Sequence, residues 1–172
     1  AYRADDPALL TWVHVTESYG FLEGFRRYSP LPLPDGAADA YYAEVRGIAE
    51  MLGARDVPGS EAEVAAFFVR VQGELRLDER SREVLRVLSN IRLPVPMAGL
   101  SRDLFLGAGT ALLPDWASRT LELGRFERAR AAVASRTLRT LSPMFRVALT
   151  DGVAPRACRR VGVDPHALER WA

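Results

Sequence analysis

The stretch from Asp6 to Phe25 constrains the fold most, because its pattern is that of one long helix that is apolar on most of its sides. Asp6 is a favourable N-cap residue, and Pro7 suits the first helical position, where its missing N–H has no intrahelical partner. A helix that is apolar nearly all round belongs inside a protein. Its apolar side chains are Leu9, Leu10, Trp12, Val13, Val15, Tyr19, Phe21, Leu22 and Phe25.

One narrow row of this expected helix is polar. Thr11, His14 and Ser18 follow one another at helical spacing, and Glu17 lies beside them. Buried polar groups are costly without partners, so the row predicts a polar neighbour: another helix's side chains, a water-filled pocket or a cofactor. A histidine beside a carboxylate can act as a general base, although spacing alone favours a core histidine satisfied by its neighbours. One histidine alone does not make a metal site, so no metal ligand set is predicted.

Composition limits the classes of function. The 172 residues, 48% of them hydrophobic, are enough for one domain with a substantial core. A formal net charge of +1 gives no argument for nucleic acid or an anionic membrane as partner. All 23 basic residues are arginine, which excludes the chemistry of a Schiff-base or P-loop lysine.

Targeting and redox signals are sparse. Cys158 is the single cysteine, so no intrachain disulfide can form. No apolar run approaches the ~18 residues of a membrane span. No signal peptide is visible, and we therefore expect a cytoplasmic protein, although the chain opens so close to a helix cap that a longer natural chain is also considered.

The remainder of the chain predicts further helices and no strand. Helices are expected over about 37–52, from Ser60, over 78–91, 99–113 and 125–150, with short helices at 114–116 and in the tail. We predict an all-α fold of about six to eight helices in a single domain, with a main helical domain over 1–150 and a short-helix appendage of it over 151–172. The side chains expected to face inward are Tyr41, Val45, Ile48, Leu52, Val64, Phe67, Phe68, Val71, Leu75, Val84, Leu85, Leu88, Phe126, Ala129, Val133, Thr137, Leu141 and Met144.

Three weaker signals favour ordinary roles. The arginines of 125–150 suit a solvated helix face better than a phosphate-binding one. The tail around Gly162 has the outline of a helix-turn-helix but no basic recognition helix, so DNA binding is the least favoured function. Cys158 has no histidine base nearby in sequence, and His166 is expected on the surface.

Several motifs resemble the MpaB-type oxygenase family, which includes the bacterial latex-clearing proteins, or rubber oxygenases. The segment Tyr2–Ser18 resembles that family's Y-x-A-x-D-P-x-L-L-x-W-V-H-A-T pattern. The resemblance runs over most of the chain. Its later parts, in the expected order, are Tyr41-Tyr42-Ala-Glu44, Leu52-Gly53, Leu93-Pro-Val-Pro96 and Leu112-Leu-Pro-Asp-Trp116.

The resemblance implies a mostly helical fold with a globin-like core, a b-type haem and oxygen chemistry. In the relatives, the iron-binding histidine lies upstream of the W-V-H segment, so His14 matches the second histidine of the pattern and not the axial one. Three explanations are open: the chain is a fragment without those helices, the protein has lost haem, or His14 takes over iron ligation, which is the least favoured.

Together, the polar row and the resemblance predict an oxygenase-like protein that forms part of a haem or similar cofactor pocket and acts on an apolar substrate. His14 and Glu17 are the candidate catalytic residues. The candidate residues for binding haem b are Thr11, Trp12, His14 and Ser18. The alternative is a non-catalytic structural or interaction domain. We expect an apolar small molecule or polymer as partner, no nucleic acid and no membrane span, and a homodimer is left open.

Overall fold

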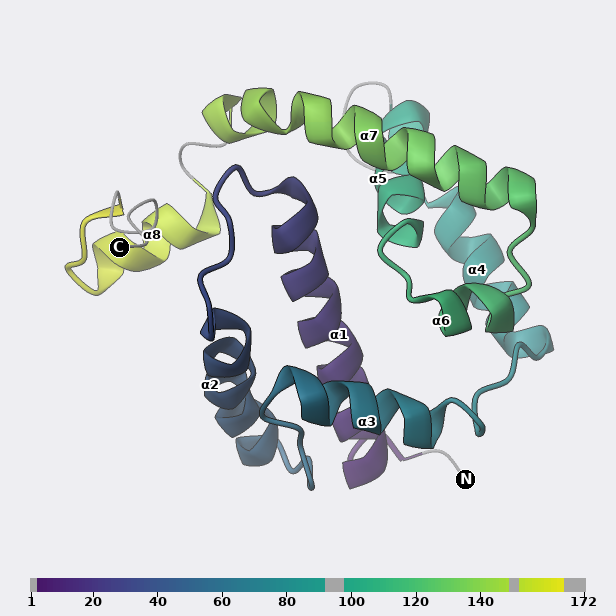
Figure 1. Cartoon of the computed structure of the whole chain (residues 1–172), viewed down its shortest axis with the longest axis horizontal. Coiled ribbons are helices and arrows are strands. Elements are labelled where there is room, and N and C mark those ends of the chain that lie inside the picture. Colours follow the sequence, from purple (N-terminus) through teal and green to yellow (C-terminus); the bar gives the residue numbers. More distant parts are fainter. Residues whose placement is uncertain (1–2, 92–97, 149–151, 166–172) are drawn as a thin grey trace.

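The computed structural model describes residues 3–91, 98–148 and 152–165, and these form eight α-helices and no strand (Figure 1). The predicted all-α class is therefore confirmed. The predicted connector 93–96, Tyr2 and His166 lie outside the described residues. The helices are α1 (Pro7–Tyr28), α2 (Ala37–Met51), α3 (Glu61–Val71), α4 (Glu79–Asn90), α5 (Ala98–Thr110), α6 (Asp115–Thr120), α7 (Arg125–Ala148) and α8 (Val153–Arg160).

Short-range capping groups fix where several helices begin. The Asp6 carboxylate accepts the backbone N–H of Ala8 at 2.8 Å, as expected of an N-cap, and α1 runs on to Tyr28. The Asp78 carboxylate accepts the N–H of Ser81 at 2.8 Å at the start of α4. After α2, Gly53 has a φ of 102°, a conformation that glycine adopts without strain, so the chain turns there.

The helix α1 runs through the middle of the molecule (Figure 1). Its part from Trp12 to Leu22 packs with α2 and α3 around a cluster of buried side chains, against which Trp116 of α6 also packs. The members of this cluster are Val15, Leu22, Ala38, Tyr42, Val64, Phe67 and Phe68. The predicted inward positions of α3 are thus confirmed at Val64, Phe67 and Phe68.

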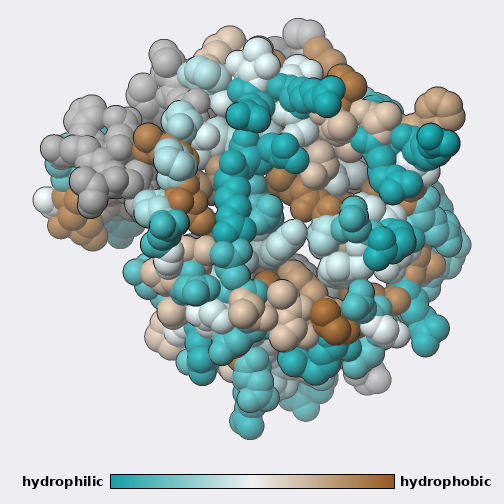
Figure 2. All heavy atoms as spheres, viewed as in Figure 1, coloured by the Kyte–Doolittle hydropathy of each residue, from teal (hydrophilic) through white to brown (hydrophobic). Residues whose placement is uncertain are grey.

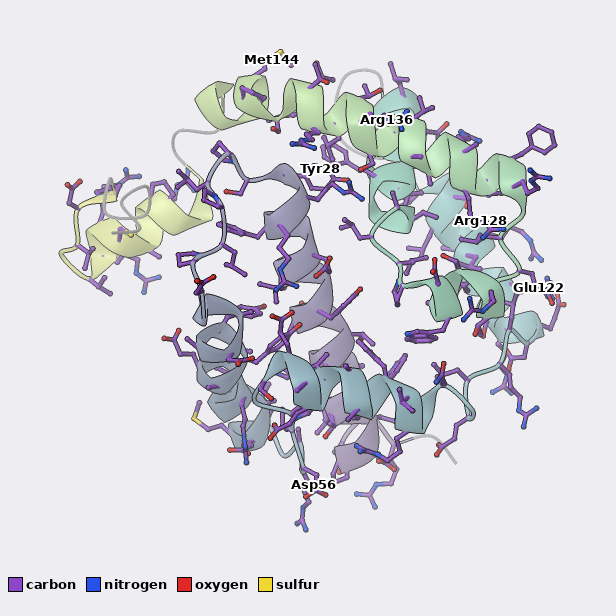
Figure 3. The ribbon with its side chains drawn as sticks, viewed as in Figure 1. Tyr28, Asp56, Glu122, Arg128, Arg136 and Met144 are labelled. Carbon is purple, nitrogen blue, oxygen red and sulfur yellow. The ribbon has the colours of Figure 1, made fainter. Side chains whose placement is uncertain are left out.

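The C-terminal end of α1 meets a second unit, formed by α5 and α7. Gly107 of α5 lies so close to α7 that a Cβ there would be 2.7 Å from the Cβ of Ala134. The Tyr28 hydroxyl lies 3.1 Å from both the Ala108 carbonyl oxygen and the Ser135 hydroxyl (Figure 3). One side chain therefore connects α1 to both helices of the pair.

Several faces predicted to be buried are exposed, which corrects the sequence-based expectation. On α7, Phe126 is 90% exposed and Val133 60%, because smaller residues at other positions, such as Ala131 and Ser135, face α5 instead. On α4, none of the residues is buried. On α2, the buried side chains are those of Ala38, Tyr42 and Ala49, whereas the predicted Ile48 is exposed; the other predicted positions now found exposed are Leu52, Val84, Leu85, Leu88, Ala129, Thr137 and Met144.

Within the described ranges, no helix combines the length and the hydropathy needed to cross a membrane. The helix α8 lies beyond the end of α7 that is nearest to the C-terminal end of α1 (Figure 1). Cys158 is buried there. The predicted boundary at residue 150, between the main helical domain and its C-terminal appendage, stays a prediction.

Candidate functional site

A cleft of about 610 Å³ opens between α1 and α3 on one side and α5 and α6 on the other, with the loop that precedes α4 at its edge. The volume falls in the range of small-molecule pockets. In the space-filling view the surface is hollowed near the centre of the face shown (Figure 2). The lining residues are Trp12, Thr16, Glu17, Tyr19, Gly20, Phe21, Phe68, Leu75, Arg76, Leu77, Ser81, Gly109, Leu112, Leu113, Pro114, Trp116, Ala117, Thr120 and Leu121.

Aromatic side chains from both sides of this cleft meet in one cluster, the aromatic wall, to which α1, α3 and α6 contribute. Phe68 of α3 stands between them, with its ring centroid 5.2 Å from that of Tyr19, 5.4 Å from that of Trp116 and 6.4 Å from that of Trp12. Edge-to-face and tilted rings at these distances attract one another. The wall is therefore a packed aromatic surface held from α1, α3 and α6.

Four hydroxyl groups lie among the described lining residues: three have partners close by, and the fourth is the phenol of Tyr19. Thr16 donates to the carbonyl oxygen of Trp12 at 2.9 Å, and Thr120 donates to that of Trp116 at 3.1 Å. The Ser81 hydroxyl donates to the Asp78 carboxylate at 2.8 Å. Since these bonds use the donors, these three hydroxyl groups add little polarity to the cleft, and its walls are largely apolar.

Two charged side chains remain among the described lining residues. Glu17 supplies the one carboxylate and Arg76 the one guanidinium group. Both side chains are exposed, so their charges lie where the cleft meets solvent. The cleft thus combines an apolar interior with one charge of each sign at its opening.

Two glycines keep the cleft open. A Cβ at Gly20 of α1 or at Gly109 of α5 would have no atom within 4 Å. Both residues line the cleft, so a side chain at either position would extend into it. Neither position is predicted from the sequence, in which the only signal for them is a glycine inside a helical pattern.

The predicted polar row does not face one common space. Thr11 lies outside this cleft, and its hydroxyl oxygen is 2.9 Å from the Pro7 carbonyl oxygen and 2.8 Å from that of Arg55. It also accepts the Arg55 N–H at 3.2 Å. The Thr11 hydroxyl therefore connects α1 to the loop after α2 and is satisfied by backbone groups.

His14 and Ser18 face the flank of α1 that borders α2. The Ser18 hydroxyl oxygen lies 3.4 Å from His14 Nε2, and the Ser18 carbonyl accepts the Tyr41 hydroxyl at 3.3 Å. Partial burial lowers the pKa of His14, and the Glu17 carboxylate opposes this shift. His14 does not line the cleft, whereas two of the predicted site residues, Trp12 and Glu17, do.

The described residues of the cleft do not fit the ligation of a haem iron. Haem iron is held in proteins by histidine, cysteine, methionine or tyrosine, and Tyr19 is the only such residue that lines the described cleft. Burial, and secondarily Glu23, raise the pKa of Tyr19, which disfavours the phenolate that would bind iron. Cys158 lies on α8, away from the cleft. The residues present fit an apolar ligand better than an iron centre.

The fold and the cleft define an all-helical domain with one largely apolar cleft among its described residues. Residues 1–147 match the family described as "ER-bound oxygenase mpaB/B'/Rubber oxygenase, catalytic domain", and the chain belongs to this family. The resemblance found in the W-V-H segment and the later motifs is therefore confirmed. No curated protein matches the chain, and no solved structure matches it.

Proposed function

We propose that the chain is the substrate-binding part of an oxygenase and that it holds an apolar substrate in the cleft between α1 and α6. The family supports oxygen chemistry. The observation that carries the proposal is the cleft itself, with aromatic and aliphatic walls, serine and threonine hydroxyl groups that already have partners, and charges only at the opening. Such a site binds a ligand through apolar surface and excludes water from it.

Glu17 is the residue that we propose as proton acceptor beside the substrate. It lines the cleft, whereas His14 does not, so the predicted pair of catalytic residues is reduced to the carboxylate. At the opening of the cleft, the carboxylate can take up a proton that is released when molecular oxygen, the oxidant, accepts electrons from the bound substrate. We derive no step through haem, since the described lining residues offer no fitting iron ligand.

The test is a variant that fills the cleft. Gly20→Leu places a side chain in it, and Gly47→Leu is the matched control, because Gly47 is an exposed glycine of α2 with equally open space around its Cβ. Binding of an unsaturated hydrocarbon such as squalene is followed by the fluorescence of the tryptophans, two of which line the cleft. Oxygen uptake is measured in parallel, both with and without added haem.

We expect Gly20→Leu to weaken hydrocarbon binding about tenfold or more, the effect of losing roughly two buried methylene groups of contact. Oxygen uptake falls with it, and Gly47→Leu leaves both unchanged. If the two variants bind the hydrocarbon equally well and take up oxygen equally fast, the cleft is not the substrate site.

A non-catalytic helical domain is the second candidate. It is favoured by Thr11, whose hydroxyl is satisfied by backbone groups, and by the lack of a fitting iron ligand among the described lining residues. In that case the hydrocarbon binds in the cleft, but no oxygen is consumed when haem is present.

A further inference from the structure

The outer face of α7 carries an apolar row that nothing in the described structure covers. Phe126, Val133 and Met144 are 90%, 60% and 59% exposed. Their spacings of seven and eleven residues bring each side chain back to nearly the same side of the helix. Met144 projects from α7 on the side away from α1 (Figure 3). The row therefore forms one line along the helix.

Four arginines occupy the adjoining face of the same helix. Arg125 and Arg136 are eleven residues apart, as are Arg128 and Arg139, so each pair shares a side of the helix. All four are exposed, and none forms an ion pair with another described residue. Over its whole length α7 has six arginines and one glutamate, a formal charge of +5.

The exposed apolar face of α4 differs in its charges. Val84, Val87 and Leu88 are exposed there as well. Two of the three arginines of α4, however, are paired: Arg82 with Glu122 at 3.0 Å and Arg86 with Glu79 and Glu83, each at 3.7 Å. With its two glutamates, α4 has a formal charge of only +1. The combination of an apolar row with uncompensated positive charge is thus a property of α7 and not of every exposed helix.

From this combination we propose that α7 lies on an anionic lipid surface, with Phe126 inserted between the headgroups and the four arginines at the phosphates. Helices with an apolar face and arginines beside it bind in the plane of such an interface, and each nearby arginine strengthens the binding. Phe126 is the deepest anchor because it is the most exposed of the three apolar side chains.

The charge distribution of the whole chain supports this orientation. Residues 1–75 have six arginines and twelve acidic residues, a formal charge of −6, whereas residues 76–172 have seventeen arginines and ten acidic residues, a formal charge of +7. An anionic surface attracts the half that contains α7 and repels the other. A symmetric dimer through α7 would instead bring two positive faces together, which disfavours a second copy as the occupant.

The test uses the full chain and two kinds of vesicle, phosphatidylcholine alone and phosphatidylcholine with phosphatidylglycerol, at low and high salt. Co-sedimentation gives the partition coefficient. The variants are Phe126→Ser and the fourfold change R125Q/R128Q/R136Q/R139Q. The control is Met51→Ser on α2, because Met51 is 81% exposed but lies in the acidic half. All of these positions are exposed, and circular dichroism verifies that each variant is folded.

We expect binding to the anionic vesicles only, lost at high salt and reduced about tenfold or more by the fourfold arginine change. Phe126→Ser reduces it as well, and Met51→Ser does not. The proposal is overturned by equal binding to neutral vesicles, or by equal effects of Phe126→Ser and Met51→Ser. It is also overturned if sedimentation shows a dimer that Phe126→Ser dissociates, or if duplex DNA is retained and the anionic vesicles are not.

Discussion

At the scale of single residues, Thr11 has the largest share of hydrogen bonds in the predicted polar row. Its hydroxyl contacts the backbone of Arg55, 44 residues further along the chain, in both directions, as donor and as acceptor. No local signal in the sequence predicts this partner. The row was correctly expected to need polar neighbours, but at Thr11 the neighbour is a loop backbone and not a cofactor.

Thr11→Val should therefore lower the free energy of unfolding by about 1–3 kcal/mol, the cost of leaving buried backbone groups without a partner. Valine has nearly the same shape and a similar helix propensity. Thr16→Val is the control, because its hydroxyl bonds only to carbonyl groups of its own helix, and less than about 0.5 kcal/mol is expected. The free energy of unfolding of both variants is measured in urea. Equal decreases in Thr11→Val and Thr16→Val would contradict the role of the Thr11 hydroxyl.

His14 should contribute to the pH dependence of stability. Partial burial holds its pKa below the ordinary value of 6.5, so the unfolded chain binds the proton more readily than the folded one. The free energy of unfolding is then fully retained above about pH 7 and falls as the pH drops through 6.5 and below. We expect His14→Gln to lose less stability than the natural chain between pH 7 and pH 5.

The measurement is urea unfolding at several pH values, with the natural chain and His14→Gln compared at each. The difference between the two chains isolates His14 from the carboxylates that also titrate in this range. Parallel stability curves for the two chains would show that burial does not perturb this histidine.

At the scale of elements, the contact between α5 and α7 depends on small residues. Gly107→Ala places a Cβ 2.7 Å from that of Ala134, so the two helices must separate. We expect a loss of about 1–3 kcal/mol in the free energy of unfolding. Gly47→Ala in α2 has open space and should gain roughly 0.5–1 kcal/mol, since alanine is the better helix former. Thermal unfolding of the two variants should therefore shift in opposite directions.

Local features of the fold could be predicted from the sequence, whereas the contact between α5 and α7 could not. Caps such as Asp6 and Asp78 are local, and they gave the helix starts correctly. The buried face of α7 was predicted wrongly, because periodicity favours large apolar residues such as Phe126. The face that is actually buried carries Ala131, Ser135 and Leu138. At the point of closest approach, Gly107 of α5 lies against Ala134, where only a small side chain fits.

The candidate site shows the same limit. Trp12 and Glu17 were predicted from α1, and the motif that contains Trp116 was noted without a role. Phe68, which holds the aromatic wall together, was recognised only as a core residue. A cleft between helices that are far apart in sequence depends on their packing, and one-dimensional spacing does not contain that information.

At the scale of the whole molecule, a net charge near zero concealed an unequal distribution. The +1 of the chain gave no reason to expect an anionic partner, yet the two halves differ strongly in formal charge. Total charge describes the field far from a protein, whereas binding depends on the charge near the contact. The exposed face of α7, and not the net charge of the chain, therefore indicates an anionic lipid surface as partner.

The position of α1 has a consequence for what the cleft can accept. This helix is fastened to α5 and α7 by Tyr28 at one end and to the aromatic wall by Trp12 and Tyr19 nearer the other. The distance between the helices on the two sides of the cleft is consequently fixed by contacts at both ends of α1. A ligand wider than the cleft would have to move the helices apart and break the hydrogen bonds of the Tyr28 hydroxyl. We therefore expect slender chains to bind more readily than bulky rings.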